Sequence, residues 1–344
     1  MSIADLVDAS VRPTVSFELM PPRNPDAAPK FWTTVRHLLA ARPDFMSVTY
    51  GAAGTDRATT RSVVTTLATQ TSVLPIAHLT CVGATRPHVA EVVDEFLDAG
   101  VRSFLALRGD PPRDQPDWQP PADGVHSSEE LIALLHEVEA SRCHRSAATA
   151  LRGAARPLTI AVATFPGGNR DAGTTPEQEV ERLLVKQRAG ASFAITQLFY
   201  EASTYASFVE RARAAGVTIP ILAGILPMTD PHRLRRVEQL TGVPAPSALV
   251  RELEALPDDD SRHERGIRAA VDLVTAVLDA GAPGLHIYTF NNHQPALDLL
   301  EGVHLGGGAP RPAPAGLGTP DLAGGPWVGA AHPLSSTTDA VVVD

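Results

Sequence analysis

Short apolar, β-branched runs alternate with longer segments of helical periodicity along most of the chain. Runs of this length, bounded by turn-forming residues, are typical of buried strands. Alternating strands and helices predict a parallel sheet, because parallel neighbours need crossover connections. Eight such runs favour a closed (β/α)₈ TIM barrel over an open doubly wound sheet. The predicted strands are Thr14–Leu19, Phe45–Tyr50, Ile76–Cys81, Val101–Leu107, Leu158–Ala163, Phe193–Phe199, Ile219–Ala223 and Leu285–Thr289.

Helical periodicity fills the segments between these runs. Several of the predicted helices end in glycine, a residue that accepts the left-handed conformation that closes a helix. These glycines are Gly100, Gly190, Gly216 and Gly281. One extra helix is expected between the seventh and eighth strands, at Ala245–Leu256. The other predicted helices include Ala58–Ala68, Pro87–Ala99, Ser128–Ala140, Pro176–Ala189, Ser203–Ala215, Pro231–Leu240 and His263–Ala280.

Two segments break the alternation of strand and helix. Pro111–Asp123 is rich in Pro and Asp and is predicted to be an extended loop. Gly306–Asp344 begins with three glycines and is rich in Pro and Ala, so it lacks the apolar surface needed to order itself. We therefore expect a barrel domain over residues 1–305 and a disordered tail over residues 306–344.

Composition restricts the class of protein. The chain has 344 residues, 44% of them hydrophobic, enough to bury a large core. A net charge of -10 argues against a nucleic-acid partner, because polyanion binding needs clustered cations. Cys81 and Cys143 give neither a disulfide framework nor metal-ligand spacing, which suits a reducing compartment. With no signal-peptide pattern and no run of roughly 18 apolar residues, we expect a cytoplasmic protein that does not bind membranes, a monomer or a small homo-oligomer.

Function in a barrel gathers at the C-terminal ends of the strands, so polar residues there are the candidates. Glu18 is either a solvated charge at the rim or a partly buried acid with a raised pKa that can deliver a proton. Asp110 either caps a turn after Gly109 or points inward. Gln197 has an amide that must satisfy a donor and an acceptor, so ligand recognition and a structural bond both remain open. His78 and Tyr50 are strand-end residues with the same two interpretations.

Several common site types are not predicted. The histidines show no metal-ligand spacing, so no metal site is expected. The chain also has no P-loop, no GxSxG nucleophile elbow and no GxGxxG dinucleotide motif after a strand.

Taken together, these strand-end motifs resemble the methylenetetrahydrofolate reductase family, over about Thr14 to Leu305. The resemblance implies a (β/α)₈ barrel that reduces 5,10-methylenetetrahydrofolate to 5-methyltetrahydrofolate, in one-carbon metabolism and methionine biosynthesis. The reductant is a reduced nicotinamide, and in most members the hydride passes through a bound FAD. The matching pieces are Ser16-Phe17-Glu18 with Pro21-Pro22, Val48-Thr49-Tyr50-Gly51-Ala52, His78-Leu79-Thr80-Cys81, Leu107-Arg108-Gly109-Asp110, Ala191 through Phe199, Gly224-Ile225-Leu226-Pro227 and Tyr288-Thr289.

The same resemblance implies roles for individual residues. Glu18 corresponds to the general acid that protonates the folate as its five-membered ring opens to an iminium ion. Asp110 corresponds to the carboxylate that binds the pterin and stabilises this cation. Gln197 corresponds to the amide that hydrogen-bonds the pterin, and Tyr50 and Phe199 are further candidates for substrate binding.

The flavin segment departs from the family pattern. Where relatives carry a Tyr-Pro-Glu-x-His-Pro-Glu-Ala type segment, this chain has Phe165-Pro166-Gly167-Gly168-Asn169-Arg170-Asp171-Ala172, and the next helix retains only Lys186 of the expected partners. Losing several polar partners weakens FAD binding by orders of magnitude. We therefore predict direct hydride transfer from NADH, with NADPH as the alternative donor, and no tightly bound FAD. The candidates for cofactor binding are Thr49, His78, Arg108, Gly109, Phe165 and Lys186.

Two other interpretations remain open. One is an ordinary FAD-dependent reductase whose flavin segment has diverged. The other is a folate-binding barrel without catalytic activity.

Overall fold

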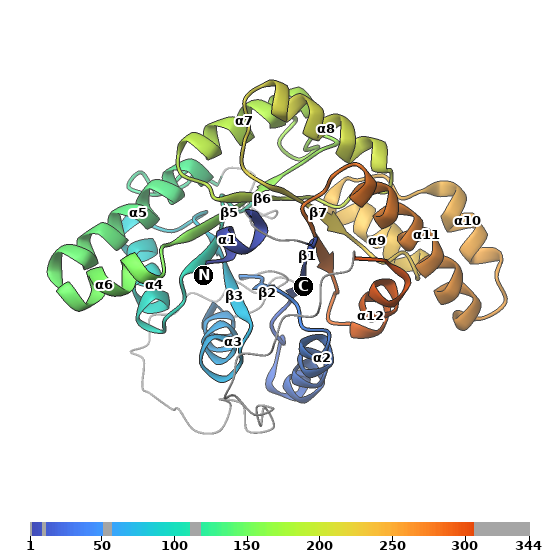
Figure 1. Ribbon diagram of the computed structural model, residues 1–344, viewed down its shortest axis with the longest axis horizontal. Coiled ribbons are helices and arrows are strands. Elements are labelled where there is room, and N and C mark those ends of the chain that lie inside the picture. Colours follow the sequence, from blue (N-terminus) through green and yellow to red (C-terminus); the bar gives the residue numbers. More distant parts are fainter. Residues whose placement is uncertain (1, 9–11, 51–56, 111–117, 306–344) are drawn as a thin grey trace.

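The computed structural model describes residues 2–8, 12–50, 57–110 and 118–305. Eight strands form a closed barrel in chain order, every neighbouring pair is parallel, and helices surround the ring (Figure 1). The predicted TIM barrel is therefore confirmed. The tail predicted for residues 306–344 and residues 111–117 of the predicted loop lie outside the described residues. The strands are β1 (Thr14–Leu19), β2 (Phe45–Val48), β3 (Leu74–Thr80), β4 (Ser103–Leu107), β5 (Thr159–Thr164), β6 (Phe193–Thr196), β7 (Ile221–Ile225) and β8 (Gly284–Tyr288).

Helices follow every strand, and the extra helix predicted between β7 and β8 is present as α10. The sequence analysis did not place α1, α2, α6 or α12. The helices are α1 (Ile3–Asp8), α2 (Ala28–Ala40) after the short 3₁₀ turn η1 (Pro25–Ala27), α3 (Arg57–Gln70), α4 (Arg86–Asp98), α5 (Ser128–Arg145), α6 (Ala147–Ala155), α7 (Pro176–Arg188), α8 (Ala202–Ala214), α9 (Pro231–Thr241), α10 (Ser247–Ala255), α11 (Asp259–Asp279) and α12 (His293–Gly302).

Six of the eight strands end one to three residues from the predicted C-terminal end, and β2 and β6 end earliest relative to the prediction. β6 ends at Thr196, three residues earlier than expected, and β2 ends at Val48 instead of Tyr50. The side-chain oxygen of Gln197 accepts the amide of Leu198 at 2.9 Å, which turns the chain out of the ladder. Gln197 and Phe199 therefore lie in the connection after β6, where a barrel places its functional groups.

Side chains of the strands alternate between two apolar layers. Val15, Phe17 and Leu19 of β1 pack outward with the helices. The inner layer includes Phe45, Ile76, Leu105, Phe193 and Leu222 from five strands. Ile3 and Val7 of α1 belong to this inner layer, so α1 covers one end of the barrel, and Figure 1 shows it across the centre of the ring.

The four glycines predicted to close helices all adopt a positive φ, from +82° at Gly100 to +109° at Gly190. Other residues are strained in this conformation. The predicted helix ends are confirmed at these positions. None of the described helices is long and apolar enough to cross a membrane.

Candidate active site

Glu18 points into the barrel. Because the neighbouring residues Phe17 and Leu19 pack outward, the alternation of a strand turns the Glu18 side chain inward. The Glu18 side chain is 19% exposed. Burial raises the pKa of Glu18 to about 7, because the charged form loses hydration. At neutral pH the group is therefore protonated in a large fraction of the molecules, as a proton donor requires.

His78 on β3 lies next to Glu18 but forms no ion pair with it. Its Nε2 atom is 3.8 Å from a carboxyl oxygen of Glu18, beyond hydrogen-bond range. Burial lowers the pKa of His78 to about 3, so the imidazole is neutral at physiological pH. The Nε2 atom is buried and has no hydrogen-bond partner in the described protein, and the same holds for Oγ1 of Thr49. Unpaired buried polar atoms are costly, so both are candidates to bond a ligand.

A hydrogen-bonded layer lies beneath this pair, formed by inward side chains of β1, β2 and β8. His286 contacts the hydroxyl of Ser16 through Nδ1 at 2.8 Å and that of Ser47 through Nε2 at 3.2 Å. Burial, and to a smaller extent His78, lowers the pKa of His286 to about 3. The layer is therefore uncharged, and it offers Glu18 no cation that would favour its ionised form.

Tyr288 crosses the barrel from β8 to β6. Its hydroxyl donates to the carbonyl oxygen of Thr196 at 2.7 Å. Burial, followed by the nearby Glu18, raises the pKa of Tyr288, so the phenol stays protonated. Gly224 of β7 makes this crossing possible: a Cβ at that position would lie 2.2 Å from the Thr196 carbonyl oxygen and 2.8 Å from the Tyr288 ring.

Asp110 lines a cavity of about 770 Å³ beyond β4 and β5. Arg108, Gly109, Phe165 and Lys186 line the same cavity, so five of the predicted site residues come together here. Asp110 and Arg108 are exposed to it. The lining carries three cationic side chains (Arg108, Arg182 and Lys186) and three acidic ones (Asp110, Glu129 and Glu181). The cationic side chains suit an anionic group such as the diphosphate of a dinucleotide.

Lys186 and Glu179 are held in place by the barrel wall. The ammonium group of Lys186 donates to the carbonyl oxygen of Ala163 at 2.8 Å, and burial lowers its pKa. Glu179 is only 1% exposed and accepts hydrogen bonds from Thr174 at 2.5 Å and Arg182 at 3.2 Å. These contacts orient the cationic side of the cavity.

The polar groups of the connection after β5 hydrogen-bond to one another. Asn169 and Thr174 exchange two main-chain hydrogen bonds of 3.0 Å, and the Asn169 side chain accepts two more amides. Thr175 and Gln178 cap the start of α7. Few main-chain donors in this connection remain for the ring of a flavin. The described residues therefore fit the phosphates of a nucleotide through cationic side chains and do not single out a flavin.

Gln197 and Phe199 line a second cavity, of about 550 Å³. Phe165 and Thr174 line this cavity as well as the first, so the two cavities adjoin. Phe199 is 3% exposed and stacks on Tyr205 with ring centroids 5.7 Å apart. Tyr50 is also buried in the outer apolar layer, at 7% exposure.

The structure therefore brings the predicted residues to one end of the barrel in three groups. Glu18, Thr49 and His78 occupy the interior, the Asp110 group lines the larger cavity, and Gln197 with Phe199 lines the smaller one. Asp110 and Gln197 do not line the same described cavity. Residues 51–56, which follow β2 at this end, lie outside the described part of the chain.

The sequence analysis did not assign a role to Tyr288, His286 or Asn291. The available signal was the placement of His286 and Tyr288 at alternate positions of an otherwise apolar strand, which puts both on the inner face. Asn291, in the turn after β8, hydrogen-bonds the main chain of Met20 through its side chain. Nothing in the sequence pattern indicated these bonds, because they depend on the conformation of the turn.

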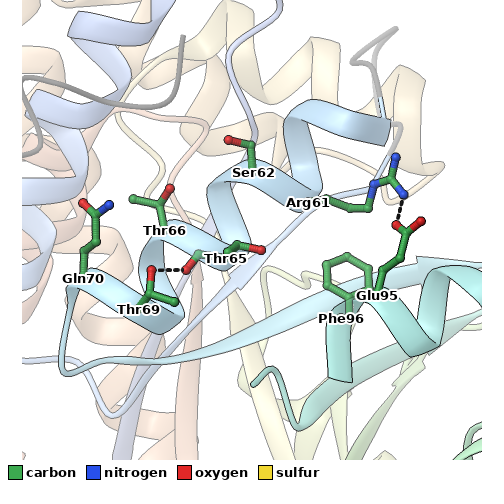
Figure 2. A pocket seen from close by; sticks show the side chains of 8 residues that line it. All are labelled: Arg61, Ser62, Thr65, Thr66, Thr69, Gln70, Glu95 and Phe96. Carbon is green, nitrogen blue, oxygen red and sulfur yellow. Dashed lines mark hydrogen bonds and ion pairs between the residues drawn. The ribbon is translucent and has the colours of Figure 1, made fainter. Parts of the chain in front are cut away.

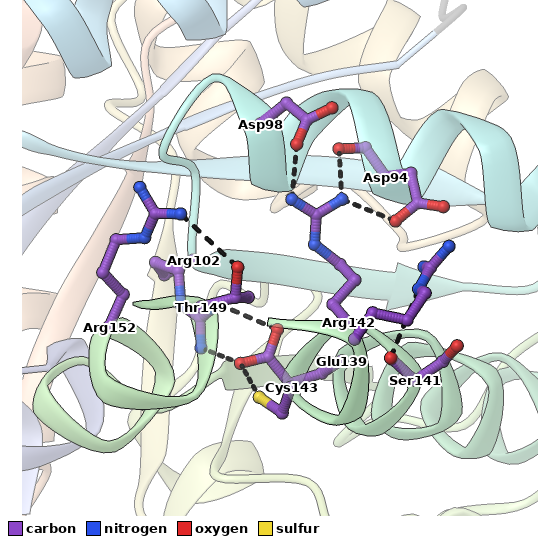
Figure 3. Close-up of polar contacts among 10 residues, drawn as sticks. Asp94, Asp98, Arg102, Glu139, Ser141, Arg142, Cys143, Thr149 and Arg152 are labelled. Carbon is purple, nitrogen blue, oxygen red and sulfur yellow. Dashed lines mark hydrogen bonds and ion pairs between the residues drawn. The ribbon is translucent and has the colours of Figure 1, made fainter. Parts of the chain in front are cut away.

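Two other polar features lie away from the strand ends. A groove of about 400 Å³ separates α3 from α4 and is lined mainly by Ser and Thr (Figure 2). Arg142 joins Asp94 and Asp98, and Arg102 joins Glu139, in a network that ties α4 to α5 (Figure 3). Both features belong to the helical layer outside the barrel.

Comparison with known proteins points to one family. A family model described as methylenetetrahydrofolate reductase matches residues 3–304. The 5,10-methylenetetrahydrofolate reductase of Pectobacterium carotovorum subsp. carotovorum is 30% identical over 289 residues, which cover 83% of this chain and 88% of the relative. The enzyme of the same name from Escherichia coli (strain K12) is 30% identical over 280 residues, 80% of this chain and 86% of the relative. A probable methylenetetrahydrofolate reductase (NADH) from Oryza sativa subsp. japonica is 27% identical over 306 residues, 86% of this chain and 49% of the relative.

Solved structures share the barrel at lower identity. An uncharacterized protein from Clostridium thermocellum that binds two copies of 5-methyl-5,6,7,8-tetrahydrofolic acid superposes with a TM-score of 0.57 at 14% identity, covering 87% of this chain and 98% of that one. At this identity the likeness supports the fold alone.

Proposed function

The chain belongs to the methylenetetrahydrofolate reductase family, and from this premise we propose that it reduces 5,10-methylenetetrahydrofolate to 5-methyltetrahydrofolate with NADH, by direct hydride transfer. The observation that carries the proposal is the inward carboxyl of Glu18, whose pKa burial raises to about 7. An acid buried among neutral groups suits a reaction that must begin with a proton transfer. The substrates and the two free cysteines support a cytoplasmic location.

Glu18 acts first. Its carboxyl proton passes to the folate nitrogen that leaves as the five-membered ring opens, the carbon–nitrogen bond breaks, and the methylene carbon becomes an iminium cation. A hydride from the nicotinamide then adds to this carbon and yields the methyl group. Glu18, now a carboxylate, recovers its proton from water, which its pKa near 7 allows at neutral pH.

In this proposal Asp110 and Gln197 hold the pterin from two different cavities, which share Phe165 and Thr174 in their walls. The carboxylate of Asp110 bonds the pterin and lowers the energy of the iminium cation, because a fixed negative charge stabilises the developing positive one. Gln197 offers an amide just after β6, and Phe199 lines the same cavity. Tyr50, which lies in the outer apolar layer and lines neither cavity, is given no contact with the substrate in this proposal.

The nucleotide shares the larger cavity with the pterin that Asp110 bonds. Arg108 and Lys186 face its phosphates, Gly109 and Phe165 line its path, and the unpaired Thr49 and His78 atoms face the reacting ring. The name of the rice relative supports NADH as the donor. The self-bonded connection after β5 supports hydride transfer without tightly bound FAD. FAD, if bound, would relay the same hydride through its ring.

Isotope transfer tests the whole proposal. The purified protein is incubated with methylenetetrahydrofolate and NADH deuterated at the transferred position, and the product is analysed by mass spectrometry. We expect 5-methyltetrahydrofolate with one deuterium in its methyl group, at the full enrichment of the NADH. Loss of label to water would indicate a flavin relay, since the hydrogen on the flavin nitrogen exchanges with solvent. Absence of product, with folate bound, would indicate a binding barrel without activity.

A further inference from the structure

The turn after β8 is hydrogen-bonded to the end of β1, two residues beyond Glu18. We call the two bonds between the Asn291 side chain and the Met20 main chain the clasp. The side-chain amide of Asn291 donates to the Met20 carbonyl oxygen at 2.5 Å, and its oxygen accepts the Met20 amide at 3.0 Å. The β1–β8 register ends with Glu18 opposite Tyr288. Asn291 therefore continues this pairing with a side chain where no strand neighbour remains.

Thr289 fixes the carbonyl of Glu18 itself. Its hydroxyl donates to that oxygen at 2.7 Å and accepts the Asn291 amide at 3.2 Å. On the other side of β1, the Thr49 amide donates to the Leu19 carbonyl at 2.9 Å. The main chain on both sides of Glu18 is thus held.

The side chain of Glu18, by contrast, has no hydrogen bond within the described protein, and the nearest polar group is His78 Nε2 at 3.8 Å. The direction of the carboxyl group therefore depends on its main chain and on apolar packing. The clasp therefore has a larger effect on the orientation of this carboxyl group than it would have on a carboxylate held by its own hydrogen bonds.

The main chain of the turn is also strained. Phe290 and Asn291 have φ values of +47° and +56°, although neither is glycine. Such conformations persist where the surroundings over-determine them, and they cluster at functional sites. Asn tolerates the left-handed region better than most residues, and here its side chain makes both bonds to Met20.

We propose that Asn291 is a positioning residue for Glu18: its clasp on Met20 keeps the carboxyl group inward and shielded from water. This inference rests on the proposed role of Glu18 as proton donor. Without the clasp, the end of β1 moves and the carboxyl group gains hydration. Proton transfer then slows, and the pKa of Glu18 falls from about 7 towards its ordinary value.

The test compares two glycine variants of the same turn. Asn291→Gly tolerates the left-handed conformation but removes the clasp, and Phe290→Gly relieves the same kind of strain and leaves the clasp intact. For Asn291→Gly we expect kcat to fall about tenfold to a hundredfold with KM for the folate nearly unchanged, because misplacing a reacting group costs rate and not binding. Its alkaline limb in the pH dependence of kcat should move to lower pH. Phe290→Gly should keep the wild-type kcat and limb.

A second variant guards against a folding defect. Thr289→Val keeps the buried volume and removes the bond to the Glu18 carbonyl, so it should shift the limb in the same direction. Thermal melting of each variant shows whether it is folded. Wild-type kcat and limb in both Asn291→Gly and Thr289→Val, while Glu18→Gln is inactive, would overturn the clasp and leave the proposed function standing. An active Glu18→Gln would instead overturn the proposed role of Glu18 as proton donor, on which the clasp proposal rests.

Discussion

The carboxyl group of Glu18 lies among neutral groups, with His78 on one side and Tyr288 on the adjacent strand. Its raised pKa therefore comes from lost hydration and not from a neighbouring charge. Such a residue destabilises the folded protein when it ionises. A catalytic acid can offset this loss of stability in function, because the raised pKa makes its proton available near neutral pH.

This cost predicts how stability depends on pH. The folded pKa of about 7 lies above the ordinary 4.5, so the folded state holds the proton more firmly. The unfolding free energy should fall as pH rises from 4.5 to 7, by about 3 kcal/mol from this one residue. Glu18→Gln cannot ionise and should lose this part of the dependence. Chemical unfolding of both proteins at pH values below and above this window measures the difference, and identical profiles would contradict the assignment.

At the scale of single residues, the sequence indicated which residues are candidates for the site better than it indicated what surrounds each of them. Glu18, Asp110 and Gln197 were chosen because polar side chains stand at the ends of apolar strands. The sequence could not decide between a rim charge and a buried acid for Glu18, since that depends on His78 and Tyr288 from distant strands. The role of Asn291 could not be predicted, because its contacts require a left-handed turn and an Asn in the sequence does not by itself indicate one.

Among the elements, β6, β7 and β8 meet at one tight crossing. Gly224 lies between the Thr196 carbonyl and the Tyr288 ring, and its amide donates to the Thr196 hydroxyl at 2.8 Å. The Tyr288 hydroxyl bonds the Thr196 carbonyl at the same place. Three strands are thus joined just below the active-site end.

Gly224→Ala should therefore destabilise the barrel. Its Cβ would lie 2.2 Å from a main-chain oxygen, which cannot move without shifting β6. We expect a loss of about 3 kcal/mol in unfolding free energy, at the upper end of overpacking costs. Gly167→Ala is the matched control, because a Cβ there meets nothing within 4 Å. Equal stability of the two variants, measured by chemical unfolding, would show that the crossing is not tight.

The elements themselves were predictable where their periodicity is long. All eight strands were expected, because each is a continuous apolar run. α1 was not, because a helix of six residues is too short to show a clear periodicity, although its Ile3 and Val7 are buried against the barrel. The end of β6 was placed three residues late because the bond from Leu198 to the Gln197 side chain, which breaks the strand, leaves no mark in hydrophobicity.

At the scale of the whole molecule, helices enclose the barrel (Figure 1). The larger cavity lies beyond β4 and β5, at the end of the barrel that holds the candidate site residues. The alternation of strand and helix predicted this architecture. The division of the end into two cavities that share Phe165 was not predictable, because it depends on how the connections fold back.

The hydrogen bonding in the connection after β5 also predicts the visible absorption spectrum of the purified protein. Because the connection after β5 bonds to itself, we expect no visible flavin absorption to survive gel filtration of the protein. Added FAD should leave the rate of folate-dependent NADH oxidation unchanged. A flavin spectrum that co-elutes with the protein would contradict the proposal of direct transfer and favour a reductase with a divergent flavin site.

The central claim is that Glu18 protonates the folate, and one comparison tests it most directly. Folate-dependent NADH oxidation and folate binding are measured for the wild type, for Glu18→Gln and for Glu91→Gln, whose carboxylate is 74% exposed on α4. We predict that Glu18→Gln binds folate but has lost at least about a hundredfold in rate, while Glu91→Gln matches the wild type. Wild-type turnover by Glu18→Gln would contradict the account.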